Sequence, residues 1–163
     1  MTRKVGIIGL GHVGSTIANY IVTGGFADEL VLIDTNEKKV NADATDFHDA
    51  MANLPFHTNI TVNDYSAIKD ADVVISAVGN ISLQKDNKEH DRFIELPFTK
   101  VAVKSVSEKI KASGFNGILI DITNPCDVIT TMYQHFTGLP KNHVMGTGTL
   151  LDSSRMRRAV SSE

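Results

Sequence analysis

The sequence predicts an α/β protein in which helices cover both faces of a parallel sheet, a doubly wound architecture. Short apolar runs of strand length alternate with segments whose apolar residues recur at helical spacing. This alternation is typical of βαβ units joined by right-handed crossovers. The chain has 163 residues and no internal repeat or low-complexity linker, so we expect one main domain that is large enough to bury a core.

The expected strands are short, and most are continuously apolar. The run at 73–78 is β-branched and apolar, which indicates a strand near the centre of the sheet. The run at 59–63 alternates polar and apolar residues, which is typical of a half-buried strand. In chain order, the expected strands are 4–10, 30–33, 59–63, 73–78, 118–122 and 144–146.

The first two expected helices have recognisable ends. The helix after the first strand carries an apolar face over residues 13–22, and Gly24 and Gly25 end it. Asn36 is placed to cap the second helix, which extends to about residue 51. Each of these helices connects two consecutive strands, as the doubly wound architecture requires.

The second half of the chain continues the pattern after a long polar stretch at 79–91, which is rich in charges and has no apolar period. A loop of this length more often carries a function than serves only as a connection. The next helix has Val103, Val106 and Ile110 on one face and ends at Gly114. Two further helices are expected, at 127–136 and from residue 149 onward.

Composition and charge narrow the possible partners. The net charge of −3 offers no attraction to nucleic acid or to an anionic membrane, and no apolar stretch reaches the ~20 residues that span a bilayer. The N-terminal apolar run is interrupted by glycines and lacks a cleavage site, which favours a buried strand over a signal peptide. The single cysteine, Cys126, cannot form an internal disulfide, which fits a reducing compartment. We therefore expect a cytoplasmic protein that binds small molecules.

The clearest motif is the sequence GLGHVG, which follows the first expected strand and opens the first helix. Gly9, Gly11 and Gly14 have the spacing G-x-G-x-x-G of a dinucleotide-binding loop. The first glycine allows a tight turn, the second lets a pyrophosphate approach the backbone, and the third lets the helix pack on the strand. The helix N-terminus then offers N–H groups and about half a positive charge to the phosphates. The motif predicts a Rossmann-type fold.

An acidic residue supports the same interpretation. Asp34 ends the second expected strand, about 20 residues beyond the glycine motif, where its carboxylate would accept hydrogen bonds from the adenosine ribose and repel a 2′-phosphate. Thr35 follows it rather than an arginine, which favours NAD over NADP. The alternative is that Asp34 only shapes a turn at the end of the strand.

Further polar residues follow the later strands, at the sheet edge where ligands bind in open α/β folds. Gln84 and Arg92 lie in the loop after the fourth strand, and Asn124, in the sequence TNPCD, is expected to be extended because proline follows it. Asp152 and Arg155 are three residues apart and would share one face of the last helix. Each has a purely structural alternative: the start of a helix, a turn, or an exposed ion pair worth under about 1 kcal/mol.

Taken together in this order, the motifs resemble the L-lactate/malate dehydrogenase family along the whole chain. The resemblance rests on GLGHVG, LIDTNEKK, DYSAIKDADVVI, DRF, ITNPCDV and GTGTLLDSSRMRR. Within the family, GNISLQKDNKEHDRF and DFHDAMANL are most similar to L-2-hydroxyisocaproate dehydrogenase. The resemblance implies an NAD-dependent oxidoreductase that interconverts an L-2-hydroxy acid and its 2-oxo acid, usually as a homodimer or homotetramer.

The resemblance also implies roles for individual residues. Asp152 would orient a histidine that exchanges the hydroxyl proton, and Arg92 would polarise the reacting carbonyl. Arg155 would bind the substrate carboxylate, with Asn124 and Gln84 as further substrate contacts beside Arg92. The implied cofactor contacts are Gly9, Gly11, Val13, Gly14, Asp34, Lys39, Tyr65, Gly79, Asn80, Ser105, Asn124 and Thr147.

The sequence departs from the family pattern in two ways. The family's catalytic histidine lies in a Gly-Glu-His-Gly motif beyond the position of Asp152, and this sequence contains no such motif. The segment between Gly79 and Arg92 is longer than in lactate and malate dehydrogenases, which favours a branched substrate such as 2-oxoisocaproate. None of the histidines present matches a catalytic position: His12, His48, His57, His90, His135 and His143.

We therefore expect residues 1–146 to form the NAD-binding domain and residues 147–163 to begin a substrate domain. The chain by itself would bind NAD but would turn over 2-oxo acids negligibly, since loss of a general acid–base typically costs about 10²–10⁴-fold in rate. The alternatives are a stand-alone NAD-binding regulatory module, a malate dehydrogenase, and an NAD-dependent glycosidase, whose metal ligands are not recognisable in this sequence. No metal site is predicted.

Overall fold

The strands form one parallel sheet. The computed structural model describes residues 2–84, 91 and 93–161, and within them the sheet has six strands in the order β3-β2-β1-β4-β5-β6. Every pairing between neighbouring strands is parallel, and the order reverses between β1 and β4, as in a doubly wound nucleotide-binding fold. The predicted fold class is confirmed. The strands are β1 (Lys4–Ile8), β2 (Glu29–Ile33), β3 (Asn59–Val62), β4 (Val73–Ser76), β5 (Ile118–Asp121) and β6 (Val144–Gly146).

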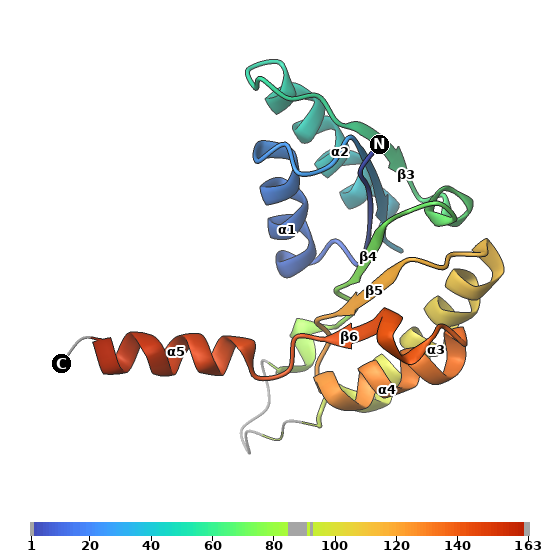
Figure 1. Ribbon diagram of the computed structural model, residues 1–163, viewed down its shortest axis with the longest axis vertical. Helices are drawn as coiled ribbons and strands as arrows, with labels where there is room; N and C mark the ends of the chain where they lie inside the picture. Colours follow the sequence, from blue (N-terminus) through green and yellow to red (C-terminus); the bar gives the residue numbers. More distant parts are fainter. Residues whose placement is uncertain (1, 85–90, 92, 162–163) are drawn as a thin grey trace.

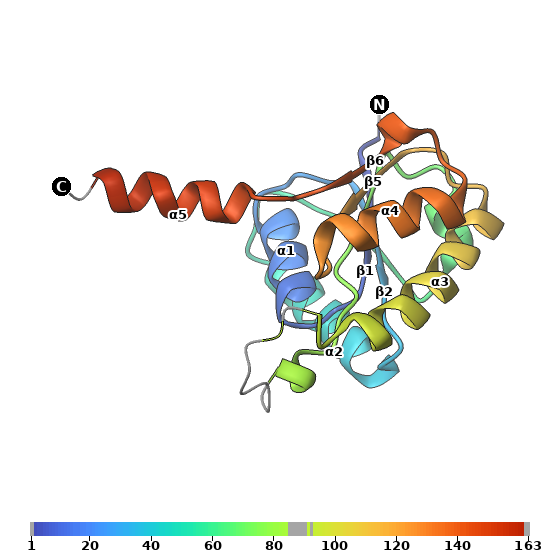
Figure 2. The same ribbon diagram turned by 90° about the horizontal axis from the view of Figure 1, so that it is seen from below.

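Helices cover both faces of the sheet (Figures 1 and 2). In β2, Leu30 and Leu32 belong to an apolar cluster under α1 and α2, whereas Val31 and Ile33 belong to a second cluster under α3 and α4. Successive strand residues point to opposite faces, so a continuously apolar strand serves both clusters. The helices are α1 (His12–Thr23), α2 (Glu37–Met51), α3 (Leu96–Ser113), α4 (Cys126–Thr137) and α5 (Leu150–Ser161), with short 3₁₀ helices η1 (Tyr65–Ile68), η2 (Ile81–Gln84) and η3 (Lys141–His143).

The predicted helix ends are confirmed where a capping residue marks them. The Asn36 side chain accepts a hydrogen bond from the Lys39 main-chain N–H at 3.2 Å and so caps α2. Gly114 ends α3 in the left-handed conformation, with φ of 78°. The stretch at 79–91 was predicted to be a loop, but its described part contains the helix η2.

Four of the six predicted strands were too long at their carboxyl ends, whereas those at 30–33 and 144–146 end where β2 and β6 end. The runs 4–10 and 73–78 leave the sheet after Ile8 and Ser76, and the runs 59–63 and 118–122 each end one residue early. Gly9 has φ of +94° and Asn63 has φ of 53°, and both conformations turn the chain away from the strand direction. Apolar character continues past the turn at Gly9 because Leu10 is fully buried.

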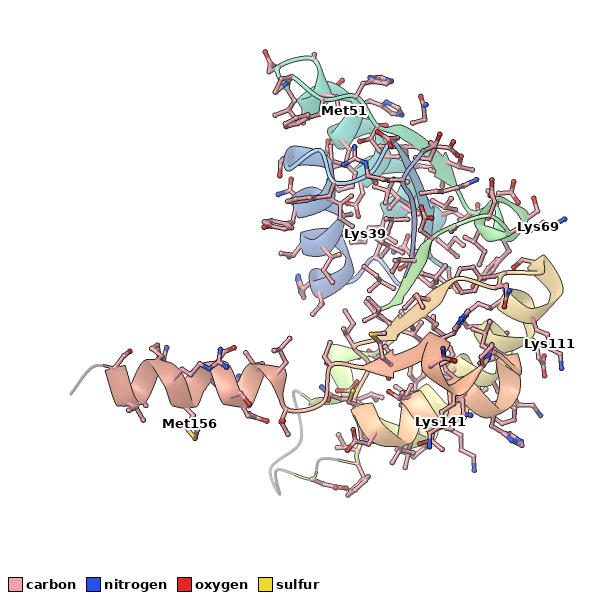
Figure 3. The ribbon with its side chains drawn as sticks, in the orientation of Figure 1. Lys39, Met51, Lys69, Lys111, Lys141 and Met156 are labelled. Carbon is pink, nitrogen blue, oxygen red and sulfur yellow. The ribbon has the colours of Figure 1, made fainter. Side chains whose placement is uncertain are left out.

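The helix α5 projects away from the sheet (Figures 1 and 2). All of its residues are exposed, and in Figure 3 its side chains, Met156 among them, surround the helix with no other described element beside them. The last strand, β6, ends at Gly146, and the domain boundary near this residue stays a prediction. Among the described residues, no helix has both the length and the apolar character needed to cross a membrane.

Candidate functional site

The glycine loop lies at the carboxyl end of β1, where the strand order reverses. A Cβ on Gly9 would lie 2.7 Å from the carbonyl oxygen of Ala77, and a Cβ on Gly14 would overlap the carbonyl oxygen of Gly9. A Cβ on Gly11 would have no heavy atom within 4 Å. The packing of the chain itself therefore requires glycine at two of the three positions. At the third, Gly11 leaves open space in which a ligand can approach the backbone.

The N-terminus of α1 is available for an anion. The helix begins at His12, the residue before it contributes no side-chain hydrogen bond, and its first turn contains no acidic residue. The first N–H groups of a helix have no partner within the helix, and the helix dipole adds positive potential there. These features fit the pyrophosphate of a dinucleotide.

Asp34 links the glycine loop to the end of β2. Its Oδ2 accepts a hydrogen bond from the Leu10 main-chain N–H at 2.5 Å, and its Oδ1 accepts one from the Asn36 main-chain N–H at 2.7 Å. The carboxylate of Asp34 therefore shapes the turn at the end of β2, as the alternative interpretation of this residue predicted. Each carboxylate oxygen has a further lone pair, and Asp34 lines a cavity, so the same group can also accept ribose hydroxyls.

Two adjoining cavities lie over the carboxyl ends of the central strands. The larger, of about 590 Å³, includes Asp34, Tyr65 and Ser105 in its lining, and the smaller, of about 340 Å³, includes Val13, Asn80 and Asn124. They share a wall formed by Gly11, Lys39, Ala77, Val78 and Gly79. The structure therefore brings most of the predicted cofactor residues to one groove that has a compartment on each side of the glycine loop. Gly14 lies beneath the groove, and Thr147 is not in its lining.

Tyr65 forms part of the larger compartment. Burial, with a smaller contribution from the nearby charge of Asp34, raises the pKa of the Tyr65 hydroxyl to about 12. The Lys109 ammonium lies 5.2 Å from the centre of the Tyr65 ring, within the range of a cation–π contact. Lys109 also lines the compartment. It could not be predicted from the sequence, because it lies in no motif and has no distinctive spacing from the residues that do.

Lys39 is engaged by side chains at the shared wall. Its Nζ donates to Ser15 Oγ at 2.7 Å and forms an ion pair with Asp43 Oδ2 at 2.6 Å. An ammonium has three N–H donors, so one donor remains beyond these two contacts. Lys39 lies near the centre of Figure 3, beside α1.

The floor of the smaller compartment is built from the end of β5. Asn124 and the following Pro125 are joined by a cis peptide bond. Thr147 comes close to this segment because its main-chain N–H donates to the carbonyl oxygen of Asp121 at 3.1 Å. The Cys126 Sγ lies 3.9 Å from Thr147 Oγ1. These contacts bring Asn124 and Thr147, which are far apart in sequence, to neighbouring places.

Asp121 itself was missed by the sequence analysis. It is fully buried at the end of β5, and burial raises the pKa of its carboxyl to about 6. The available signal was an acidic residue within the otherwise apolar strand sequence ILID. A charged residue in a central parallel strand is unusual because both faces of such a strand are buried.

Of the residues predicted to act on the substrate, Asn124 lines the groove, whereas Asp152 and Arg155 do not. Asp152 and Arg155 lie on α5 and form an exposed ion pair, with 3.3 Å between Arg155 Nη1 and Asp152 Oδ1 and about 60% of each side chain exposed. Neither is in the lining of the two compartments. In this structure Asp152 and Arg155 therefore form the exposed ion pair that the alternative interpretation predicted. Arg92 lies outside the described residues, as does the side chain of Gln84.

Comparisons with known proteins point to one family. The family model described as the lactate/malate dehydrogenase NAD-binding domain matches residues 3–146. The L-lactate dehydrogenase of Fusobacterium nucleatum is 40% identical over 98% of this chain and 49% of its own length. The L-lactate dehydrogenase 1 of Bifidobacterium longum is 39% identical over 99% of this chain and 50% of its own length.

Solved structures show the same relationship. The ligand-bound minor L-lactate dehydrogenase of Enterococcus mundtii has a TM-score of 0.87 and 34% identity, covering 98% of this chain and 50% of that one. The Cryptosporidium parvum lactate dehydrogenase in complex with lactic acid and NAD has a TM-score of 0.87 and 33% identity, covering 99% and 50%. The chain spans about half the length of these relatives. It belongs to the lactate/malate dehydrogenase family and carries that family's NAD-binding domain.

Proposed function

We propose that this chain is the NAD-binding part of an NAD-dependent L-2-hydroxy-acid dehydrogenase of the lactate type. The observation that carries the proposal is the groove in which Gly11 faces open space beside an uncapped helix N-terminus and the carboxylate of Asp34. The L-lactate dehydrogenases among its relatives support the reaction type.

The proposed binding mode follows the two compartments. Asp34 accepts the adenosine ribose hydroxyls in the larger compartment, beside Tyr65 and Ser105, and its charge disfavours a 2′-phosphate. Gly11 and the first turn of α1 hold the pyrophosphate. The nicotinamide end enters the smaller compartment toward Asn124. The chemistry that NAD supplies when bound is acceptance of a hydride from the carbinol carbon of the substrate.

The proposed substrate contacts come from the later part of the chain. Arg155 binds the substrate carboxylate through its planar fork of donors, a geometry that lysine lacks. Arg92 stabilises negative charge on the carbonyl oxygen. Asp152 orients the histidine that exchanges the hydroxyl proton, and that histidine belongs to a segment outside this sequence. We also propose that residues 147–163 begin the substrate domain, so that Asp152 and Arg155 reach the groove only when that domain is present.

The proposed substrate is a branched 2-oxo acid such as 2-oxoisocaproate, because the stretch between Gly79 and Arg92 is long enough to cover a bulky side chain. The test is to measure kcat/KM of the longer dehydrogenase for 2-oxoisocaproate, pyruvate and oxaloacetate. A preference for 2-oxoisocaproate supports this substrate. A preference for pyruvate assigns the protein to the lactate enzymes, and a preference for oxaloacetate assigns it to the malate enzymes.

The 163-residue chain is proposed to bind NADH without catalysing its oxidation. The test is to mix the chain with NADH and each 2-oxo acid and to follow NADH absorbance, with the longer protein as the positive control. Oxidation by the short chain at a normal dehydrogenase rate would contradict the proposal. A stand-alone NAD-binding module is the second candidate, but it gives no role to Asp152 and Arg155. A Gly-Glu-His-Gly sequence encoded beyond codon 163 decides for the dehydrogenase.

We further propose that the longer protein acts in the cytoplasm as a homodimer or homotetramer. The apolar side chains exposed on α5 support association with other protein surface: Leu150, Leu151, Met156 and Val160. Light scattering of the longer protein measures its mass directly, and a monomer would contradict the oligomer.

A further inference from the structure

Asp121 is a buried carboxyl group directly beside the smaller compartment. It ends β5, none of its surface is exposed, and the next three residues, 122–124, line the compartment. Among the described residues no lysine or arginine forms an ion pair with it. Burying an unpaired carboxylate is costly, and an apolar residue would fill the same place in a strand that is buried on both faces.

The side chain of Asp121 instead makes contacts with two separate elements. Its Oδ1 accepts a hydrogen bond from the Thr123 main-chain N–H at 3.0 Å, and its Oδ2 accepts one from Thr130 Oγ1 of α4 at 3.1 Å. Its main-chain oxygen accepts the N–H of Thr147 at 3.1 Å, beyond the end of β6. One residue therefore holds the loop after β5, the first turns of α4 and the loop after β6.

The side-chain contacts of Asp121 fix the backbone on one side of the proposed nicotinamide pocket, because residues 122–124 line it. Thr123 directly precedes Asn124, toward which the nicotinamide end is proposed to enter. Thr123 is placed by the bond from its main-chain N–H to Asp121 Oδ1. A hydrogen bond to a charged acceptor contributes more stabilisation than one to a neutral acceptor, so the ionised carboxyl holds the loop most firmly.

We propose that Asp121 is a positioning residue for the nicotinamide end of NAD. Its ionised carboxylate holds the loop that carries Asn124 in the arrangement that binds the cofactor, and protonation of this carboxylate weakens cofactor binding. The inference rests on the proposed function of the groove as an NAD site. It adds a residue that contacts no ligand and acts through the segments that do.

The groups that face Asp121 from the neighbouring elements are Tyr133, Cys126 and Gly146. On α4, burial raises the pKa of the Tyr133 hydroxyl well above its usual range, and this hydroxyl is hydrogen-bonded to Ser76 Oγ of β4 at 2.6 Å. Cys126 of α4 lies 3.8 Å from the main-chain oxygen of Asp121. Gly146, paired with Asp121 on β6, has no side chain. Burial raises the pKa of Asp121 to about 6, so its protonation changes between pH 5 and 7.

The test compares the NADH dissociation constant of the 163-residue chain at pH 5.5 and pH 7.5, measured by NADH fluorescence. Three variants are needed: Asp121→Asn, Asp127→Asn and His12→Gln. Asp127 is exposed in the first turn of α4, so its substitution removes the same charge without touching the buried contacts. His12 lines the smaller compartment, so His12→Gln tests whether another side chain of the pocket causes the pH dependence.

The unsubstituted chain is expected to bind NADH about three- to tenfold more weakly at pH 5.5 than at pH 7.5, as the weakening of one charge-assisted hydrogen bond predicts. Asp121→Asn should bind at both pH values about as weakly as the unsubstituted chain does at pH 5.5. Asp127→Asn and His12→Gln should keep the difference between the two pH values. Circular dichroism at both pH values checks that every protein is folded.

Two results would overturn the inference. One is the same pH dependence in Asp121→Asn as in the unsubstituted chain, and the other is tight binding by Asp121→Asn at both pH values. Both results leave the NAD site in place. If no protein binds NADH at either pH, the proposed function itself fails and this inference fails with it.

Discussion

The glycine loop provides a paired test of which glycines serve the fold and which serves a ligand. In Gly14→Ala the new methyl group would overlap the carbonyl oxygen of Gly9, so the backbone must move. Overpacking of this kind costs about 1–3 kcal/mol, and the better helix propensity of alanine offsets up to about 1 kcal/mol of it. We expect Gly14→Ala to lower the free energy of unfolding by about 1–2 kcal/mol.

Gly11→Ala is the matched control, because the same methyl group is added three positions earlier. Its Cβ would have no neighbour within 4 Å, and Gly11 has φ of −68° and ψ of −167°, which alanine adopts without strain. Alanine at an N-cap position lowers the free energy of unfolding, and the less flexible unfolded chain raises it. Each effect is under about 1 kcal/mol, so the two nearly cancel. We expect the free energy of unfolding to change by less than about 0.5 kcal/mol.

The assay for both variants is equilibrium unfolding in urea without cofactor, followed by circular dichroism. The slope of the free energy against urea should stay the same, so that the midpoint reports stability alone. Equal destabilisation by the two substitutions, or an unchanged Gly14→Ala, would refute the assignment of Gly14 to packing and Gly11 to ligand space.

Three further outcomes are expected. Asp121→Asn should raise the free energy of unfolding at pH 7.5 by up to about 3 kcal/mol and much less at pH 4, because burial raises the pKa of this carboxyl from 3.8 to about 6. The folded state therefore holds the proton more tightly than the unfolded state, so the free energy of unfolding falls as pH rises through this range. Urea unfolding of the unsubstituted chain and of Asp121→Asn at the two pH values measures the effect of the substitution. An equal effect at both pH values would contradict this expectation. Asp34→Asn should weaken NADH binding about ten- to hundredfold, since a charge-assisted hydrogen bond is lost. NADPH binding, measured by the same titration, should become stronger. Weaker binding of both cofactors would contradict repulsion between Asp34 and the 2′-phosphate. Asp152→Ala should change the free energy of unfolding by less than about 1 kcal/mol, because its ion pair with Arg155 is exposed, and a larger loss in urea unfolding would show an unrecognised contact.

The stability and binding expectations for Asp121 have opposite directions. Removing its charge should make the chain more stable and the proposed cofactor site weaker. Such opposition is common at functional sites, where a costly group is retained for what it does. If Asp121 had a purely structural role, NADH binding by Asp121→Asn would show the same pH dependence as NADH binding by the unsubstituted chain.

Much of the fold could be predicted because local patterns carried it. The apolar runs of β1 and β2 and the capping residues Asn36 and Gly114 each depend on neighbours within a few positions. The glycine motif was informative because its spacing combines a turn, a helix start and a close packing contact. The strand ends were less predictable, since Gly9 and Asn63 end strands through backbone angles that apolar patterns do not report.

The site could be predicted only in part because it depends on contacts between distant segments. The proximity of Asn124 to Thr147 follows from the pairing of β5 with β6 and from the main-chain bond to Asp121. The engagement of Lys39 by Ser15 follows from the packing of α2 beside α1. Neither contact has a sequence spacing that reveals it. The exposed positions of Asp152 and Arg155 on α5 could not be predicted either, since spacing on a helix places two side chains together without stating what faces them.

The central claim is that the groove at the carboxyl ends of β1, β4 and β5 binds NAD with its pyrophosphate against Gly11. The most direct measurement is a fluorescence titration of the 163-residue chain and of Gly11→Ala with NADH at pH 7.5. The account predicts saturable binding by the unsubstituted chain and at least about tenfold weaker binding by a Gly11→Ala variant whose free energy of unfolding is unchanged, because the added methyl group occupies the ligand space. Equal affinity of the two proteins for NADH, or no saturable binding by the unsubstituted chain, would contradict it.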